Sequence, residues 1–195
     1  MKSIPALAVV LALGATVWAQ TGTQGPQLDA DRARAVGPRI ELAERVARDP
    51  ELQAALTARN ARLESDEVIQ RKDREWQADR NSPLRKEVTG SPCSARLRAL
   101  LQADPIVVEA FLMDAKGALV CSTVETSDYW QGDEAKWQQT YRDGRERFVD
   151  EPALDVSTGT YAIQLSILVS SGGRKAGALT LTLKFPRKKE PGTGQ

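Results

Sequence analysis

The chain has 195 residues, with 27 Lys and Arg against 26 Asp and Glu, two Cys and no His. The lack of His excludes Ser-His-Asp triads, Cys-His pairs and His-ligated zinc or haem, and two Cys alone cannot complete a four-ligand zinc site. The near-zero net charge argues against nucleic acid as a partner, because nucleic-acid-binding domains carry a strong basic excess.

The N-terminus has the pattern of a secretory signal peptide. Lys2 gives a basic start, residues 4–17 form an almost wholly apolar run, and Val17 and Ala19 fit a cleavage site after Ala19. The run is shorter than the ~20 residues needed to span a bilayer. We therefore predict a signal peptide over residues 1–19 and a soluble periplasmic or secreted protein. An uncleaved N-terminal anchor is the alternative.

The composition of the mature chain changes near residue 104. Residues 28–104 are rich in Ala, Arg, Glu and Leu, which favour helix. Asp49-Pro50 is typical of a helix start, residues 81–83 end the helical run, and a shorter helix is expected over residues 94–103. This helical region, residues 20–92, is either a partner-binding surface or an amphipathic layer packed on the domain that follows.

Residues 105–185 predict five strands with a helical insertion over residues 127–141 after the second strand. Apolar residues alternate in the last two strands, and Gly-containing turns separate the segments. The expected strands are residues 105–113, 118–124, 147–150, 160–170 and 175–185. We predict an α+β fold with one antiparallel sheet, covered on one face by the N-terminal helices and on the other by the insertion. Residues 187–195 read as a disordered tail.

Cys93 and Cys121 are the only cysteines. An oxidising compartment favours a disulfide between them, which would contribute ~3 kcal/mol by loop-closure entropy. Two buried, unpaired thiols are the alternative, since sequence alone does not give the Cα separation.

An aromatic cluster mixed with carboxylates follows the second predicted strand. Five rings fall within twenty residues: Tyr129, Trp130, Trp137, Tyr141 and Phe148. Flat apolar walls with a few fixed polar groups are typical of a small-molecule pocket. Asp128 would receive an amine there, with Tyr129 and Trp130 as walls. Alternatively, Trp130, Trp137 and Tyr141 are core residues that anchor the insertion on the sheet, and Asp128 and Tyr129 form a cap.

The order of motifs resembles a known family. A helix precedes a hairpin with Met113-Asp114-Ala115-Lys116-Gly117, and then come residues 126–137, Phe148-Val149-Asp150, and strands over 161–166 and 177–181. Over residues 93–186 this is similar to PDC or Cache-type extracytoplasmic sensor domains, which have a PAS-like fold. The resemblance implies a five-stranded sheet, a long N-terminal helix behind it, and a ligand bound between the sheet and the overlying loops. The ligand-binding residues that it implies by position are Asp128, Tyr129, Trp130, Trp137, Tyr141, Arg147 and Tyr161.

We therefore predict a freestanding periplasmic sensory module that binds an amine, amino acid or carboxylate. It would signal through a membrane kinase, chemoreceptor or transporter, because the sequence has no second membrane-spanning run and no output domain. The alternative is an interaction or scaffold protein that docks through its N-terminal helices. An enzyme is not expected: Asp133 and Glu134, like Asp150 and Glu151, are adjacent and diverge on a regular element. No motif for a phosphate loop, a nucleophile or a metal is found, so no cofactor and no metal site are predicted.

Overall fold

The computed structural model of the protein describes residues 30–155 and 158–185. The predicted signal peptide and C-terminal tail lie outside these residues. The helices of the described part are α1 (Ala30–Ala47), α2 (Pro50–Asn60), α3 (Asp66–Ala78), α4 (Pro83–Gly90), α5 (Pro92–Leu101), the single turn α6 (Ala135–Trp137) and the π-helical turn η1 (Gln138–Arg142). Within the described ranges, no helix has the length and apolar character that crossing a membrane requires.

Side-chain caps explain where the helices α2 to α5 begin. Asp49 accepts hydrogen bonds from the backbone N–H groups of Glu51 and Leu52, as the Asp49-Pro50 pattern predicted. A Ser cap precedes each of the next three helices, at Ser65, Ser82 and Ser91. The Asn81-Ser82-Pro83 segment therefore ends one helical run and also starts α4, a helix that the sequence analysis did not predict.

The sheet is antiparallel and has six strands, one more than predicted. The strands are β1 (Val107–Met113), β2 (Leu119–Ser122), β3 (Arg147–Val149), β4 (Ala153–Asp155), β5 (Thr160–Ser171) and β6 (Arg174–Lys184). Their spatial order is β2-β1-β6-β5-β3, and β4 pairs with β5 as well. The predicted α+β fold is confirmed. The additional strand, β4, has only three residues and too little alternation to be recognised in the sequence.

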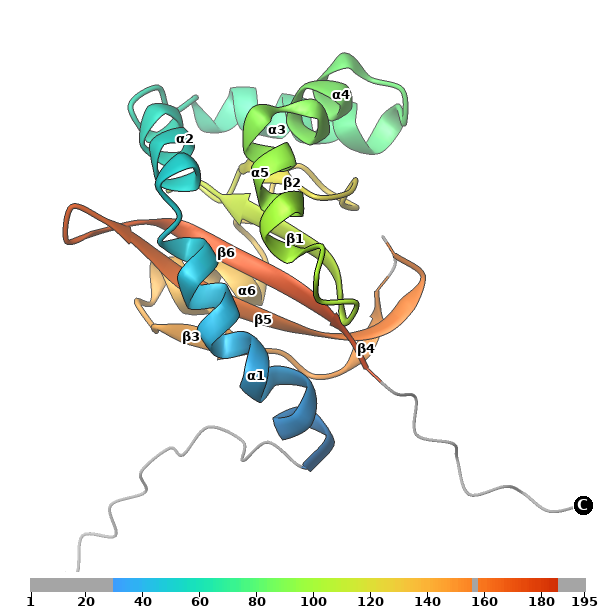
Figure 1. Ribbon diagram of the computed structural model, residues 1–195. Helices are drawn as coiled ribbons and strands as arrows, with labels where there is room; N and C mark the ends of the chain where they lie inside the picture. The colour runs from blue at the N-terminus through green and yellow to red at the C-terminus, as the bar shows by residue number, and fades with distance from the viewer. Residues whose placement is uncertain (1–29, 156–157, 186–195) are drawn as a thin grey trace, which may run out of the picture.

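The two faces of the sheet are covered by different layers. On β5, Ile163 and Leu165 pack into the main core together with apolar side chains of α1, α2 and α5. Ala162 and Gln164 face the opposite side. Figure 1 shows α1, α2 and α5 on the near face of the sheet and α6 behind it. The predicted arrangement, helices on one face and insertion on the other, is thus observed.

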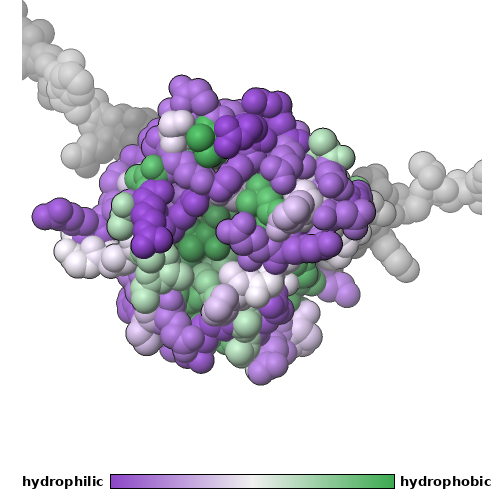
Figure 2. Space-filling model, turned by 90° about the horizontal axis from the view of Figure 1, so that it is seen from above, coloured by the Kyte–Doolittle hydropathy of each residue, from purple (hydrophilic) through white to green (hydrophobic). Residues whose placement is uncertain are grey.

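A second core lies beside the β1–β2 hairpin. It joins Ile69 and Trp76 of α3 and Leu84 and Val88 of α4 to Tyr129 and the hairpin. Hydrophilic residues cover most of the outer surface at this helical end of the molecule, and hydrophobic side chains are visible between them toward the middle (Figure 2). The helices α3 and α4 therefore serve as a lid on the hairpin end of the sheet.

The predicted helix over residues 127–141 is wrong for its first half. Helical structure begins only at Ala135. Before that point the chain pairs with the hairpin: Leu119 N–H donates to the Tyr129 carbonyl, and Gln131 N–H donates to the Gly117 carbonyl. Because these backbone groups bond across to another strand, they are not available for helical hydrogen bonds.

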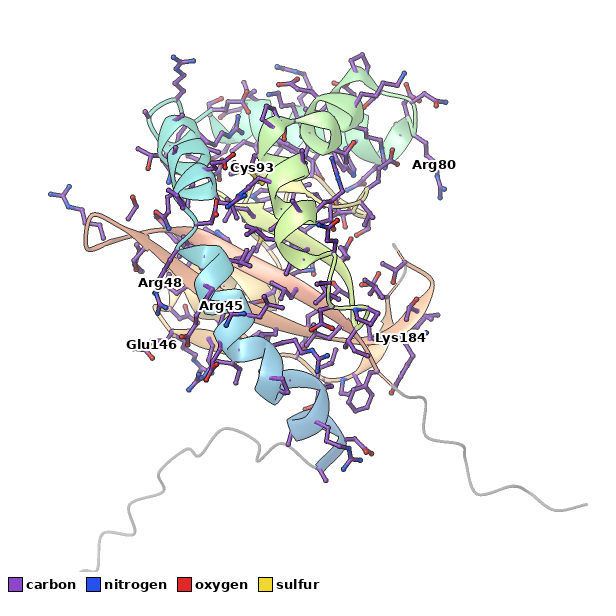
Figure 3. The ribbon with its side chains drawn as sticks, viewed as in Figure 1. Arg45, Arg48, Arg80, Cys93, Glu146 and Lys184 are labelled. Carbon is purple, nitrogen blue, oxygen red and sulfur yellow. A yellow bond between two sulfur atoms is a disulfide. The ribbon has the colours of Figure 1, made fainter. Side chains whose placement is uncertain are left out.

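Cys93 and Cys121 form a disulfide, with their Cα atoms 5.7 Å apart. The bridge joins α5 to the edge strand β2, near the place where Figure 3 labels Cys93. The first of the two alternatives left open by the sequence is therefore the one observed.

Candidate functional site

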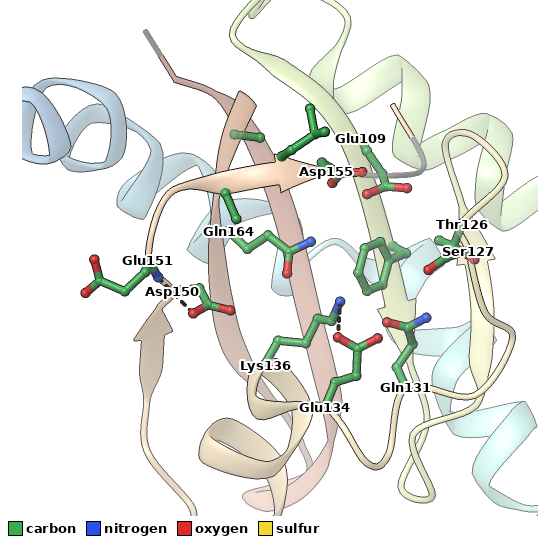
Figure 4. A pocket seen from close by; sticks show the side chains of 14 residues that line it. Glu109, Thr126, Ser127, Gln131, Glu134, Lys136, Asp150, Glu151, Asp155 and Gln164 are labelled. Atoms are coloured by element: carbon green, nitrogen blue, oxygen red, sulfur yellow. Dashed lines mark hydrogen bonds and ion pairs between the residues drawn. The ribbon is translucent and has the colours of Figure 1, made fainter. Parts of the chain in front are cut away.

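A cavity of about 210 Å³ lies on the sheet face opposite the main helical layer. It is enclosed by β1 and β5, the segment before and within α6, and the chain around β4 (Figure 4). Its walls are Glu109, Phe111, Thr126, Ser127, Gln131, Glu134, Lys136, Asp150, Glu151, Ala153, Leu154, Asp155, Ala162 and Gln164. This volume holds several water molecules or one small organic molecule.

The floor of the cavity is a polar row across three strands. The Glu109 carboxylate is only 2% exposed and accepts a hydrogen bond from the Thr182 hydroxyl at 2.8 Å. The Gln164 amide lies 3.4 Å from the same hydroxyl. The register places Glu109 and Gln164 opposite Thr182 on its two sides. A buried sheet face that serves only as structural core usually carries apolar residues. The polar residues on this face are therefore unusual.

The cavity lining carries more negative than positive charge. The described residues of its walls contribute five carboxylates and one ammonium group, that of Lys136. Lys136 Nζ is 2.9 Å from Glu134 Oε2 and 5.3 Å from the centre of the Phe111 ring. The Lys136 ammonium is thus engaged by a carboxylate and an aromatic face.

Gln131 is the buried amide of the lining, with 1% of its surface exposed. Its Nε2 donates to the backbone carbonyl of Asp128 at 2.9 Å. Its Oε1 has no hydrogen-bond partner. A buried acceptor without a partner is rare in folded proteins and calls for an explanation.

The ionisation of Asp150 should make the free energy of unfolding depend on pH. Desolvation raises its pKa above the ordinary value of 3.8, although nearby Lys136 acts in the opposite direction. Below pH 3.8 the carboxyl is protonated in both the folded and the unfolded chain. As the pH rises through the raised folded pKa, the unfolded state ionises first, so the free energy of unfolding falls.

We therefore expect Asp150→Asn to be more stable than the wild type at pH 7 and equal to it near pH 3. Thermal unfolding midpoints measured from pH 3 to pH 7 test this, and the gap between the two proteins should widen as the pH rises. A gap independent of pH would show that folding does not shift the pKa of Asp150.

None of the seven residues predicted as ligand-binding is among those that line this cavity. Asp128 lies beside it and accepts hydrogen bonds from Gln77 and Ser127. Tyr129 is buried against Trp76, and its hydroxyl accepts from Arg59 at 2.7 Å. Tyr129 is thus a core residue, whereas the alternatives weighed for it from the sequence were a pocket wall and a cap.

The two predicted tryptophans lie on the other side of the β1–β2 turn. The indole N–H of Trp130 donates to the Lys116 carbonyl, and that of Trp137 donates to the Asp114 carbonyl. Both rings line a groove of about 560 Å³ next to α3, which is separate from the cavity.

The remaining three predicted residues are spread over the insertion and the sheet. Tyr141 stacks on Trp137, with ring centres 5.2 Å apart. Arg147 is exposed, 3.9 Å from Glu44, and Tyr161 contacts Phe185. A ligand-binding role for the seven stays a prediction, and the structure does not gather them into one site.

The residues that do line the cavity were missed because the aromatic rings were given more weight than inward-facing polar residues. The available signal was Glu109 within Val107–Met113 and Gln164 within Thr160–Ser171, each a polar residue between apolar neighbours in a buried strand.

No protein-family model matches the chain, and no curated protein matches it in sequence. Among solved structures, it is similar to the sensor domain of the V. cholerae histidine kinase DctB, with 14% identity and a TM-score of 0.44 over 78% of this chain and 51% of that one. It is also similar to the ligand-binding domain of the Pseudomonas fluorescens chemoreceptor CtaA in complex with L-serine, with 16% identity and a TM-score of 0.37 over 76% of this chain and 58% of that one.

A third similar structure is the sensory domain of the Campylobacter jejuni chemoreceptor Tlp3 with isoleucine bound. The identity is 15% and the TM-score 0.40, over 75% of this chain and 62% of that one. The chain therefore spans between half and two thirds of these structures, which are sensor domains of a kinase and of chemoreceptors. Because the TM-scores are below 0.5, the likeness carries no argument about the ligand.

Proposed function

We propose that the protein is an exported, non-catalytic sensory module that binds a small molecule and passes its bound state to a membrane partner. The observation that supports this most directly is the cavity on the sheet face opposite the main helical layer. Its polar floor of Glu109 and Gln164 stands where a structural core would place apolar side chains. Fixed polar groups within a partly enclosed space are what ligand recognition requires.

The groups in the walls are suited to binding. They include carboxylates, two amides, two hydroxyls and an ammonium group that Glu134 engages. Such groups recognise a ligand by hydrogen bonds and charge, and the cavity is small enough to surround a metabolite-sized molecule.

The sheet offers a path from the cavity to the N-terminal helix. Gln164 faces the cavity, while its neighbours Ile163 and Leu165 pack in the core that contains α1. A ligand that moves Gln164 therefore acts on the strand that α1 covers. We propose that α1 carries this change to the membrane partner.

A thermal-shift screen of the purified protein tests the binding function. The panel covers amines, amino acids, small carboxylates, sugars and nucleobases. A ligand at ~100 times its dissociation constant stabilises a protein by about 2.7 kcal/mol, which raises the unfolding midpoint by several degrees.

A matched pair of variants ties any such shift to the cavity. Ala153 is exposed on β4 and lines the cavity, so Ala153→Phe should fill its mouth and abolish the shift. Ala99 is exposed on α5, outside the lining, and Ala99→Phe should keep the shift. A ligand that stabilises both variants equally binds elsewhere, and silence of the whole panel would count against the proposed function.

A further inference from the structure

Resting on the proposed function, we propose that the ligand is a small alkylammonium ion, a primary or secondary amine in its charged form, that carries no carboxylate. Its N–H groups are recognised by Gln131 Oε1 and by the carboxylates of the cavity. The proposal rests on two separate observations, the unpartnered acceptor of Gln131 and the charge of the lining.

Gln131 presents an acceptor to the cavity. Its Nε2 is held by the Asp128 carbonyl, which fixes the amide so that Oε1 is the free end. The side chain rises into the space that Glu109, Glu134 and Lys136 also face (Figure 4). A buried acceptor left without a partner is unfavourable, and a ligand that brings an N–H donor relieves this.

The charge of the lining selects a cation. Within the part of the lining that the structure describes, the carboxylates of Glu109, Glu134, Asp150, Glu151 and Asp155 outnumber the ammonium of Lys136. A negatively lined, partly enclosed cavity concentrates cations, because the field is focused between walls of low dielectric.

The same lining disfavours a ligand carboxylate. Among the described residues of the walls, Lys136 is the only basic one, and Glu134 Oε2 lies 2.9 Å from its Nζ. A bound amino acid would place its carboxylate close to the carboxylates of the walls. Lys136 is already paired with Glu134, so the carboxylate of the ligand would have no counter-ion. Loss of an ion partner for a buried charge is costly.

Matched pairs of ligands separate these requirements on the unmodified protein. Each amine is compared by calorimetric titration with the amino acid that differs only by a carboxylate: propylamine with 2-aminobutyrate, butylamine with norvaline, and 1,4-diaminobutane with ornithine. Tetramethylammonium supplies a cation without N–H donors, and Ca²⁺ supplies an inorganic cation. We expect at least one amine to bind more than tenfold more tightly than its amino-acid partner, tetramethylammonium or Ca²⁺.

Two variants test the groups named. Gln131→Leu removes the acceptor and should weaken binding of the amine by about 10- to 100-fold, the range for a hydrogen bond to a charged group. Gln139→Leu makes the same substitution eight residues further on, outside the lining, and should leave the affinity unchanged. Glu109→Gln keeps the shape of the side chain and removes one charge, so it should weaken the amine and leave an uncharged ligand unaffected.

The outcomes distinguish this inference from the function on which it rests. If an amino acid, a carboxylate, tetramethylammonium or Ca²⁺ binds as tightly as the best amine, the ligand class is wrong, although the module still binds a ligand. The same holds if only an uncharged molecule from the broad screen binds. If Gln131→Leu is too unstable to titrate, the comparison of matched ligands on the wild type decides alone. If no molecule of either panel binds, both the inference and the proposed function fail.

Discussion

Replacing Trp76 with alanine is expected to destabilise the protein by about 4 kcal/mol, the range for removing a fully buried aromatic side chain. Trp76 is 0% exposed and lies in the centre of the core formed by α3, α4 and the hairpin. Its ring is 6.0 Å from that of Tyr129 and lies under the guanidinium of Arg85 at 4.7 Å. Its indole N–H donates to the Thr126 carbonyl at 2.9 Å. The variant loses the ring contacts and leaves that carbonyl without its donor.

Urea unfolding followed by circular dichroism measures the loss. Trp130→Ala provides the matched control, because Trp130 is the same residue type but half-buried at the edge of the same core. Trp130→Ala should lower the free energy of unfolding by at most about 2 kcal/mol, because Trp130 buries less apolar area on folding than Trp76 does. Trp76→Phe keeps most of the ring and removes the N–H, which separates packing from the hydrogen bond. Equal losses for Trp76→Ala and Trp130→Ala would show that Trp76 does not anchor the helical lid.

The long strands were predictable because their alternation is local. β5 and β6 alternate between the main core and the opposite face over eleven or twelve residues, so their limits were predicted within a few residues. Elements without such an alternation in their own sequence were not predictable. β4 has three residues and exists because it pairs with β5. The segment before Ala135 looked helical, but its backbone groups bond to the hairpin, a partner that is remote in sequence.

The site depends still more on remote contacts. Glu109 and Gln164 meet at Thr182 only because β6 lies between β1 and β5, which neither local sequence indicates. Aromatic residues are frequent in both cores and pockets, so their clustering did not decide between the two. Residues 126–137, which belong to the order of motifs that resembles the sensor family, contain five residues that line the cavity: Thr126, Ser127, Gln131, Glu134 and Lys136. The residues predicted as ligand-binding within this segment are their neighbours.

The second large effect is expected for Arg59→Leu, which should lower the free energy of unfolding by about 3 kcal/mol, as for breaking a buried ion pair on one side. Asp114, in the turn between β1 and β2, is 0% exposed, and its Oδ2 is 3.0 Å from Arg59 Nε. Arg59 also donates to Glu64 and to the Tyr129 hydroxyl. Without the guanidinium, the Asp114 carboxylate keeps backbone N–H donors from Lys116 and Ala118 but loses its counter-charge.

Arg62→Leu is the matched control for Arg59→Leu, because Arg62 is exposed just after the same helix and should change stability by less than about 0.5 kcal/mol.

The double variant Arg59→Leu with Asp114→Asn removes the unpaired buried charge and keeps an acceptor for both backbone donors. It should be more stable than Arg59→Leu alone, because the penalty comes from an unpaired buried charge and not from the lost attraction. Urea unfolding of the four proteins at pH 7 gives the comparison. If the double variant is the least stable of the four, the Asp114 carboxylate stabilises the turn through its backbone N–H donors even without Arg59. If Arg59→Leu matches Arg62→Leu, water reaches Asp114 and the junction between α2 and the hairpin is more open than the structure shows.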